Sequence, residues 1–144
     1  MYGQKFDIRG RDFSNAGKAS THIKQVLKDL GIEPAIVRRV AICSYEAEMN
    51  VVMYAETAVI SFSVTREKID LRIKDRGPGI PDIDLAMKEG WSTATDEMRE
   101  MGFGAGMGLP NMRRNADVFE ISSVVGEGTD LRIVIRYAQP VSEA

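Results

Sequence analysis

"MGFGAGMGLPNMRR", residues 101–114, places glycine at alternate positions directly before a predicted helix. Glycine loses the most backbone freedom on folding, so a run of glycines needs a reason. One reason is that bare backbone N–H groups can turn toward an anion. The helix expected over residues 110–116 would direct its first N–H groups and the positive end of its dipole to the same place. Taken alone, the run is compatible with a phosphate-binding wall or with a flexible loop.

Alternating apolar residues predict paired strands on both sides of this run. Before it, a "TREK" turn separates two apolar sets, which are Ile60, Phe62, Val64 and Ile69, Leu71, Ile73. After it, two further sets are joined at "GEGT", namely Phe119, Ile121 and Leu131, Ile133, Ile135. The stretch "GQKFDIRG" near the start of the chain predicts a short initial strand.

Helical spacing of apolar residues predicts two long helices before these strands. The first is expected over residues 14–30, with Gly31 as its stop. The second is expected from residue 34 to about 55, and it is apolar nearly all round, which is typical of a helix packed between other elements. "DRGPGIPD" then breaks regular structure before a short helix over residues 83–88. The pattern predicts an α+β fold: a two-layer sandwich with helices on one face of a mixed, mostly antiparallel sheet.

Length and composition indicate one globular domain over residues 1–144, with a loose tail at about 139–144. The net charge of -2 gives no sign of nucleic-acid binding. No apolar run approaches the roughly 18 residues of a membrane span. The single cysteine allows no internal disulfide, which fits a cytoplasmic location. The single histidine, His22, argues against a zinc site or a histidine-dependent hydrolase, and we expect it on a helix surface or in packing.

Two polar residues are predicted to face the apolar layer of the sheet. Asp75 continues the alternation of Ile69 and Ile73, and Thr129 continues that of Leu131 and Ile133. An inward carboxylate is costly unless it accepts hydrogen bonds. Asp75 could accept them from the loop that follows it or from a ligand.

Three polar residues interrupt the apolar second helix. Glu46 and Asn50 lie four residues apart and therefore face the same way. A carboxylate can take a proton, and an amide oxygen suits Mg²⁺. Glu48 is about 200° around the helix from Glu46, and we expect it on a solvated rim.

In order along the chain, "EAEMN" (46–50), "DRGPG" (75–79), the glycine run (102–109) and "GEGT" (126–129) resemble the four sequence blocks of the GHKL ATP-binding superfamily. This superfamily includes gyrase-type topoisomerases, heat-shock chaperones, histidine kinases and mismatch-repair ATPases. "DRGPGIPDI", "EGWST" and "GAGMGLPNMRR" look most similar to bacterial anti-sigma factors and switch-protein serine kinases of the RsbT, RsbW and SpoIIAB type. The resemblance covers nearly the whole chain.

The resemblance implies a role for each matched position. Asp75 would accept a hydrogen bond from the adenine amino group, assisted by Thr129, and Gly77 and Gly79 would let the backbone approach the base. Glu46 would be the general base, and Asn50 would bind Mg²⁺ at the phosphates. The phosphate cradle would be Gly104, Ala105, Gly106, Met107, Gly108 and Leu109. Residues at about 90–108 would form a lid over ATP, with the segment "ATDEMREM" longer than is usual. Tyr45 stands where small residues are usual, which would alter the pocket near the phosphates.

The resemblance also implies the activity. The expected function is an ATP–Mg²⁺-dependent protein serine/threonine kinase that phosphorylates a small STAS-like antagonist, because 144 residues leave no room for the transducer domains of larger members. The alternative is a non-catalytic ATP-binding module whose nucleotide controls binding to a sigma factor or antagonist. A degenerate domain without nucleotide is a third reading. A homodimer is a further expectation of the resemblance.

Overall fold

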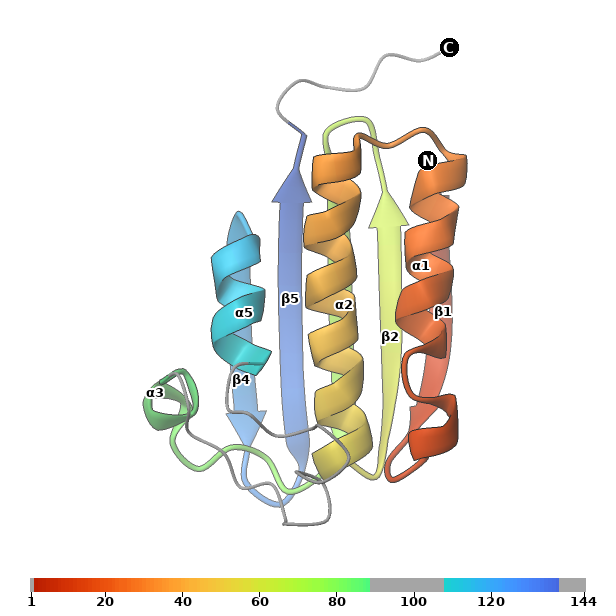
Figure 1. Ribbon diagram of the computed structural model, residues 1–144. Coiled ribbons are helices and arrows are strands. Elements are labelled where there is room, and N and C mark those ends of the chain that lie inside the picture. The colour runs from red at the N-terminus through yellow and green to blue at the C-terminus, as the bar shows by residue number, and fades with distance from the viewer. Residues whose placement is uncertain (1, 89–107, 138–144) are drawn as a thin grey trace.

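The computed structural model describes residues 2–88 and 108–137 (Figure 1). Within them lies one sheet of five strands in the order β1-β2-β3-β5-β4, and each pairing is antiparallel. The strands are β1 (Tyr2–Arg9), β2 (Thr57–Val64), β3 (Lys68–Arg76), β4 (Val118–Val124) and β5 (Gly128–Arg136). The predicted lid up to residue 107 and the predicted loose tail lie outside the described residues.

Helices cover one face of this sheet, as Figure 1 shows. They are α1 (Lys18–Asp29), α2 (Pro34–Tyr54) and α5 (Gly108–Asn115), with a short α3 (Ile83–Ala86) and the 3₁₀ helix η1 (Phe13–Asn15) at the periphery. The predicted α+β two-layer sandwich with helices on one face is confirmed.

The predicted start of the first helix, at residue 14, is wrong. Residues 13–15 form η1, and α1 starts only at Lys18, after Gly17 in the left-handed conformation at φ +94°. The side chain of Asp12 accepts hydrogen bonds from Ser14 (3.0 Å) and Asn15 (2.8 Å). This local alternative to helical bonding explains the late start, because short polar side chains compete with the helix for backbone partners. The predicted stop at Gly31 is confirmed by its φ of +76°.

The core lies between the sheet and the helices. The alternate residues Ile60, Leu71 and Ile133 are completely buried, and they face α2. α2 is packed between α1 and α5 and above the sheet (Figure 1), as its all-round apolar pattern predicted. His22 lies exposed on α1, with Nε2 3.3 Å from the side-chain oxygen of Gln4, so its surface placement is confirmed.

The topology brings the ends of two helices and two strands together. The carboxyl ends of α2 and β3 and the amino ends of α5 and β5 lie at the same end of the molecule, the lower end in Figure 1. These ends carry the polar residues and glycines singled out in the sequence.

Candidate functional site

Asp75 and Thr129 meet on adjacent strands at this end of the sheet. The backbone N–H of Thr129 donates to Asp75 Oδ1 at 3.0 Å. Burial raises the pKa of Asp75, the Thr129 bond partly lowers it, and the charge of Asp130 raises it further. Of the two interpretations of Asp75, the structure therefore shows an internal donor, although the donor comes from β5 and not from the following loop. Contact with a ligand stays a prediction.

Ser123, on β4, completes this polar corner and was missed in the sequence. Its Oγ lies 2.8 Å from the hydroxyl of Thr129, accepts from the N–H of Ile80 at 2.7 Å, and donates to the carbonyl of Gly128 at 3.0 Å. The same alternation that predicted inward Phe119 and Ile121 also places Ser123 inward, so the signal was present. Ser123 ties the "GPGIP" loop to the "GEGT" turn and orients the Thr129 hydroxyl.

Gly77 and Gly79 have packing reasons to be glycine. A Cβ on Gly77 would lie 3.1 Å from the Cα of Ala55 and 3.5 Å from Asp75 Oδ1. Gly79 has φ +74°, and a Cβ there would lie 2.5 Å from the carbonyl oxygen of Val124. Both glycines therefore let the loop after β3 approach its neighbours closely. Their predicted approach to a base stays a prediction.

Glu46 and Asn50 share one face of α2, as their spacing predicted, and that face meets the start of α5. A Cβ on Gly108 would lie 3.2 Å from Glu46 Oε2 and 3.3 Å from Asn50 Oδ1. Any side chain at position 108 would therefore crowd both the carboxylate and the amide. The structure therefore brings together Glu46, Asn50 and the last glycine of the run.

Asn111 is a further residue of this group that sequence reasoning missed. Burial raises the pKa of Glu46, and a side-chain hydrogen bond with Asn111 partly opposes that shift. Asn111 lies three residues after Gly108, so the spacing of one helical turn could have placed it on the same side of α5. Glu46 is a half-buried carboxylate held in place near a backbone without side chains.

Glu48 contradicts the expectation of a solvated rim. It is only 1% exposed. Its carboxylate accepts three backbone N–H bonds at the start of α1, from Gly17 (3.0 Å), Ala19 (3.3 Å) and Ser20 (2.9 Å). A buried carboxylate is stable when such donors satisfy it, and the positive end of a helix dipole adds to the effect. The expectation was wrong because the helical spacing of α2 does not show that the start of α1 packs against Glu48.

Other predicted positions are less informative. Leu109 packs against the core. Gly104, Ala105, Gly106 and Met107 lie outside the described residues. Tyr45 is 44% exposed, and its ring lies 3.9 Å from a Cβ built on Gly17, so it lies toward the start of α1. Among residues 2–88 and 108–137, no group of three carboxylate, histidine or cysteine side chains could hold a metal ion. No helix of the described chain is long and apolar enough to cross a bilayer.

Comparison with known proteins connects this geometry to a family. Residues 36–139 match the family model "Histidine kinase-, DNA gyrase B-, and HSP90-like ATPase". The chain is 35% identical over 115 residues to the serine/threonine-protein kinase RsbT of Bacillus subtilis (strain 168), covering 77% of this chain and 80% of that protein. It is 30% identical over 105 residues to an anti-sigma F factor of Thermoanaerobacter sp. (strain X514), covering 71% and 66% of the two chains.

A solved structure shows the same fold. The mycobacterial sensor histidine kinase MprB superposes with a TM-score of 0.55 at 14% identity, over 97% of this chain and 100% of that one. The matched family segment contains α2, β3, α5 and β5, which carry Glu46, Asn50, Asp75, Gly108 and Thr129. The chain therefore belongs to the family of histidine kinase-, DNA gyrase B- and HSP90-like ATPases.

Proposed function

We propose that the protein is an ATP–Mg²⁺-dependent protein serine/threonine kinase of the anti-sigma or switch type, acting on a small STAS-like antagonist. The observation that carries the proposal is the half-buried carboxylate of Glu46 beside Asn50 and the bare backbone of Gly108. The similarity to RsbT, a serine/threonine-protein kinase, supports the activity, and family membership supports ATP as the nucleotide.

The residues present fit a nucleotide. Asp75 and Thr129 offer acceptor oxygens at a partly buried corner, suited to an adenine amino group. At the other side, the space left open by Gly108 lies between Glu46 and Asn50, where a side chain would intrude. We assign the phosphate cradle to residues 104–109 and the Mg²⁺ contact to the side-chain oxygen of Asn50, with the remaining ligands supplied by phosphates and water.

In the proposed reaction, Glu46 accepts the proton of the partner's serine hydroxyl as that oxygen attacks. When bound, ATP would supply the γ-phosphoryl group and leave as ADP, and Mg²⁺ would neutralise the charge that develops on the phosphates. The burial that raises the pKa of Glu46 makes it a better base than an exposed glutamate. The side chain of Asn111 forms a hydrogen bond with this carboxylate and holds it in position.

A second candidate function is a non-catalytic ATP-binding module. The similarity to anti-sigma F factors favours it, because it implies a protein partner whose capture is the output. In this case nucleotide would control the affinity for a sigma factor or an antagonist without phosphoryl transfer.

The experiment that separates the two uses ATP, Mg²⁺ and the purified STAS-like protein encoded closest to this gene. Intact-mass spectrometry should show a phosphorylated partner with the wild type and none with Glu46→Gln, while Glu46→Gln still binds ATP. If the wild type leaves the partner unmodified but ATP still alters partner affinity, the kinase proposal fails and the second function holds.

A further inference from the structure

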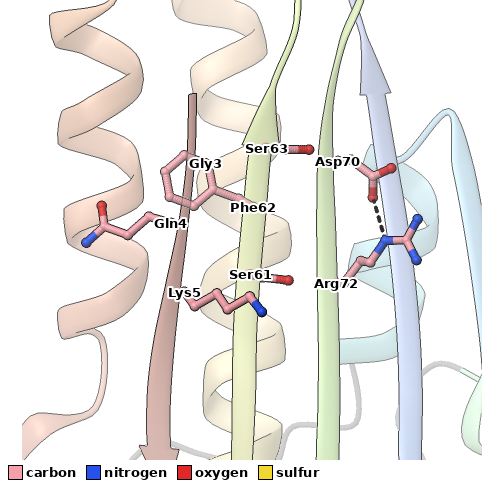
Figure 2. Close-up of a pocket in the computed structure, with 8 residues that line it drawn as sticks. All are labelled: Gly3, Gln4, Lys5, Ser61, Phe62, Ser63, Asp70 and Arg72. Atoms are coloured by element: carbon pink, nitrogen blue, oxygen red, sulfur yellow. Dashed lines mark ion pairs between the residues drawn. The ribbon is translucent and has the colours of Figure 1, made fainter. Parts of the chain in front are cut away.

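The helix-free face of the sheet carries a groove that lies on the opposite side from α2 and its Glu46. The groove has a volume of about 510 Å³ and is open to solvent. Figure 2 shows the side chains around it, which come from β1, β2 and β3. The residues that line the groove include Gly3, Lys5, Ser61, Ser63, Asp70 and Arg72.

The groove exists because small residues lie side by side on adjacent strands. The register pairs Gly3 with Ser63, and it places Ser61 between Lys5 on one neighbouring strand and Arg72 on the other. Directly opposed side chains on one sheet face are about 5 Å apart at Cβ. Ser61 therefore forms the bottom of the groove with its hydroxyl group, and the longer side chains of Lys5 and Arg72 form its two sides.

Asp70 pairs more closely with Arg132 than with Arg72, the cation next to the groove. Its Oδ2 is bound by Arg132 at 3.0 Å, and Arg132 also pairs with Glu120 at 3.0 Å. Arg72 reaches Asp70 Oδ1 only as a 3.6 Å ion pair, the dashed line in Figure 2, and its side chain is 64% exposed. That oxygen of Asp70 is buried and has no hydrogen-bond partner. Among residues 2–88 and 108–137, Arg72 makes this one polar side-chain contact, through Nε, so its two terminal nitrogens are free to donate to a ligand.

Lys5 is exposed, and within the described part of the chain it forms no ion pair. The strands that flank the groove add further positive charge on the same face, since basic side chains outnumber acidic ones. The outward charged residues of β1 and β3 are Lys5, Arg9, Lys68, Arg72, Lys74 and Arg76 against Asp7 and Asp70. In a chain of net charge -2, this is a local concentration of positive charge.

We propose that this groove is a docking site for an acidic segment of a protein partner. A carboxylate of that segment lies over the Ser61 hydroxyl, between the ammonium of Lys5 and the guanidinium of Arg72. Hydrogen bonds from lysine or arginine to a carboxylate are stronger than those between neutral groups. Complementary charges across an interface also give specificity for a partner. Single-stranded nucleic acids bind where bases can stack on aromatic rings, and these three strands present no outward aromatic ring, so the face fits a protein better than a nucleic acid.

The site is independent of the proposed phosphoryl transfer. It lies on the face of the sheet opposite to α2, so a partner docked there does not cover α2 (Figure 1). It therefore does not rest on the kinase proposal, and the test can be read without ATP.

The test measures binding of a fluorescein-labelled oligoglutamate peptide by anisotropy at low ionic strength. The double variant Lys5→Glu/Arg72→Glu should weaken binding by at least about tenfold, equivalent to 1.4 kcal/mol. The control Lys24→Glu/Lys28→Glu changes the net charge equally on the exposed side of α1 and should change the affinity by less than about twofold. A second groove variant, Ser61→Glu, fixes a carboxylate between the two cations and should also block binding, and circular dichroism checks that each variant is folded.

Several results would overturn the proposal. Equal loss in the groove and control variants would show only a net-charge effect, and no binding by the wild type would remove the site. Tighter, groove-dependent binding of a single-stranded oligonucleotide of equal charge would assign the face to nucleic acid. A dimer in sedimentation that Lys5→Glu/Arg72→Glu dissociates would assign it to a second copy of this chain.

Discussion

Helices α1 and α5 flank α2, and each begins beside one of its glutamates. At α1, the carboxylate of Glu48 is almost completely buried and accepts three backbone N–H bonds from residues 17–20. At α5, Gly108 leaves space beside Glu46 and Asn50. Both helix starts attract negative charge, because their first N–H groups have no partner within the helix.

The difference teaches how to separate a structural carboxylate from a chemical one. The anion site of α1 is filled from inside the protein, so its polar groups are used up and add stability. Among the described residues at the start of α5, Gly108 brings no side chain toward Glu46, and the Glu46 carboxylate has a pKa raised by burial. A raised pKa is common at functional sites. Substitutions at these two helix starts test the contrast.

Glu46→Gln should reduce phosphoryl transfer to the partner by about a hundredfold to ten-thousandfold, because the general base is lost. It should not lower the free energy of unfolding. Since the folded pKa of Glu46 is raised, its ionised form is destabilising above that pKa, and a neutral side chain removes this cost. Phosphoprotein yield and urea unfolding of the same sample check both parts, and a clear loss of stability would contradict the contrast.

Glu48→Ala should have the opposite profile. Three buried N–H groups at the start of α1 would lose their acceptor, and the free energy of unfolding should fall by about 3 kcal/mol. The matched control is Glu56→Ala, which removes an exposed carboxylate just after α2 and should change stability by less than about 0.5 kcal/mol. Urea denaturation with an unchanged slope measures the difference. Equal stability of the two variants would mean that the Glu48 contacts contribute nothing.

Gly108→Val should weaken ATP binding by up to about a hundredfold, because a branched side chain would fill the space between Glu46 and Asn50. The sheet does not involve this position, so its circular dichroism should persist. Calorimetric titration with ATP–Mg²⁺ gives the affinity, and an affinity equal to that of the wild type would place the phosphates elsewhere.

Asp75→Asn should weaken ATP binding by about tenfold, the value of one charge-assisted hydrogen bond. The neighbouring Asp130→Asn is the control, because it removes a charge of the same sign that is exposed on the next strand. Similar affinities of the two variants for ATP–Mg²⁺ would remove the assigned role of Asp75.

The smallest expected effect is a displacement along the pH axis. If Glu46 is the proposed general base, activity should fall as the pH falls through a pKa above the ordinary value of 4.5, because the protonated carboxyl cannot accept a proton. Asn111→Ala removes the hydrogen bond that lowers this pKa, and the acid limb of the kcat/KM profile should move to higher pH. A limb that stays in place, or moves to lower pH, would contradict the assignment of Glu46 and Asn111.

The elements of the fold could be read from the sequence because their signals are local. The alternation of Ile69, Leu71 and Ile73 predicted a strand with one buried face. The all-round apolar pattern of α2 predicted a helix packed between other elements. Asp75 and Thr129 were placed inward by the same parity, and the structure joins them by a hydrogen bond. The order of the strands depends on which apolar faces pack together, and it appears only in the folded chain.

The misses share a physical cause, which is contact between distant segments. Glu48 meets residues about thirty positions earlier in the chain, and no spacing rule reports such a contact. Strand alternation could have placed Ser123, but its importance depends on its contact with Thr129. Helical spacing could have placed Asn111, but its importance depends on its hydrogen bond with Glu46. The late start of α1 results from Asp12, whose side chain binds its own loop.

We propose that the start of α5, unlike that of α1, receives its anion from a bound nucleotide. Thermal unfolding with and without ATP–Mg²⁺ tests it most directly, because a ligand of the native state must raise Tm. We predict a rise for the wild type, a smaller rise for Asp75→Asn at the same ATP concentration, and a retained rise for Glu46→Gln. An unchanged Tm of the wild type at millimolar ATP–Mg²⁺ would contradict the account.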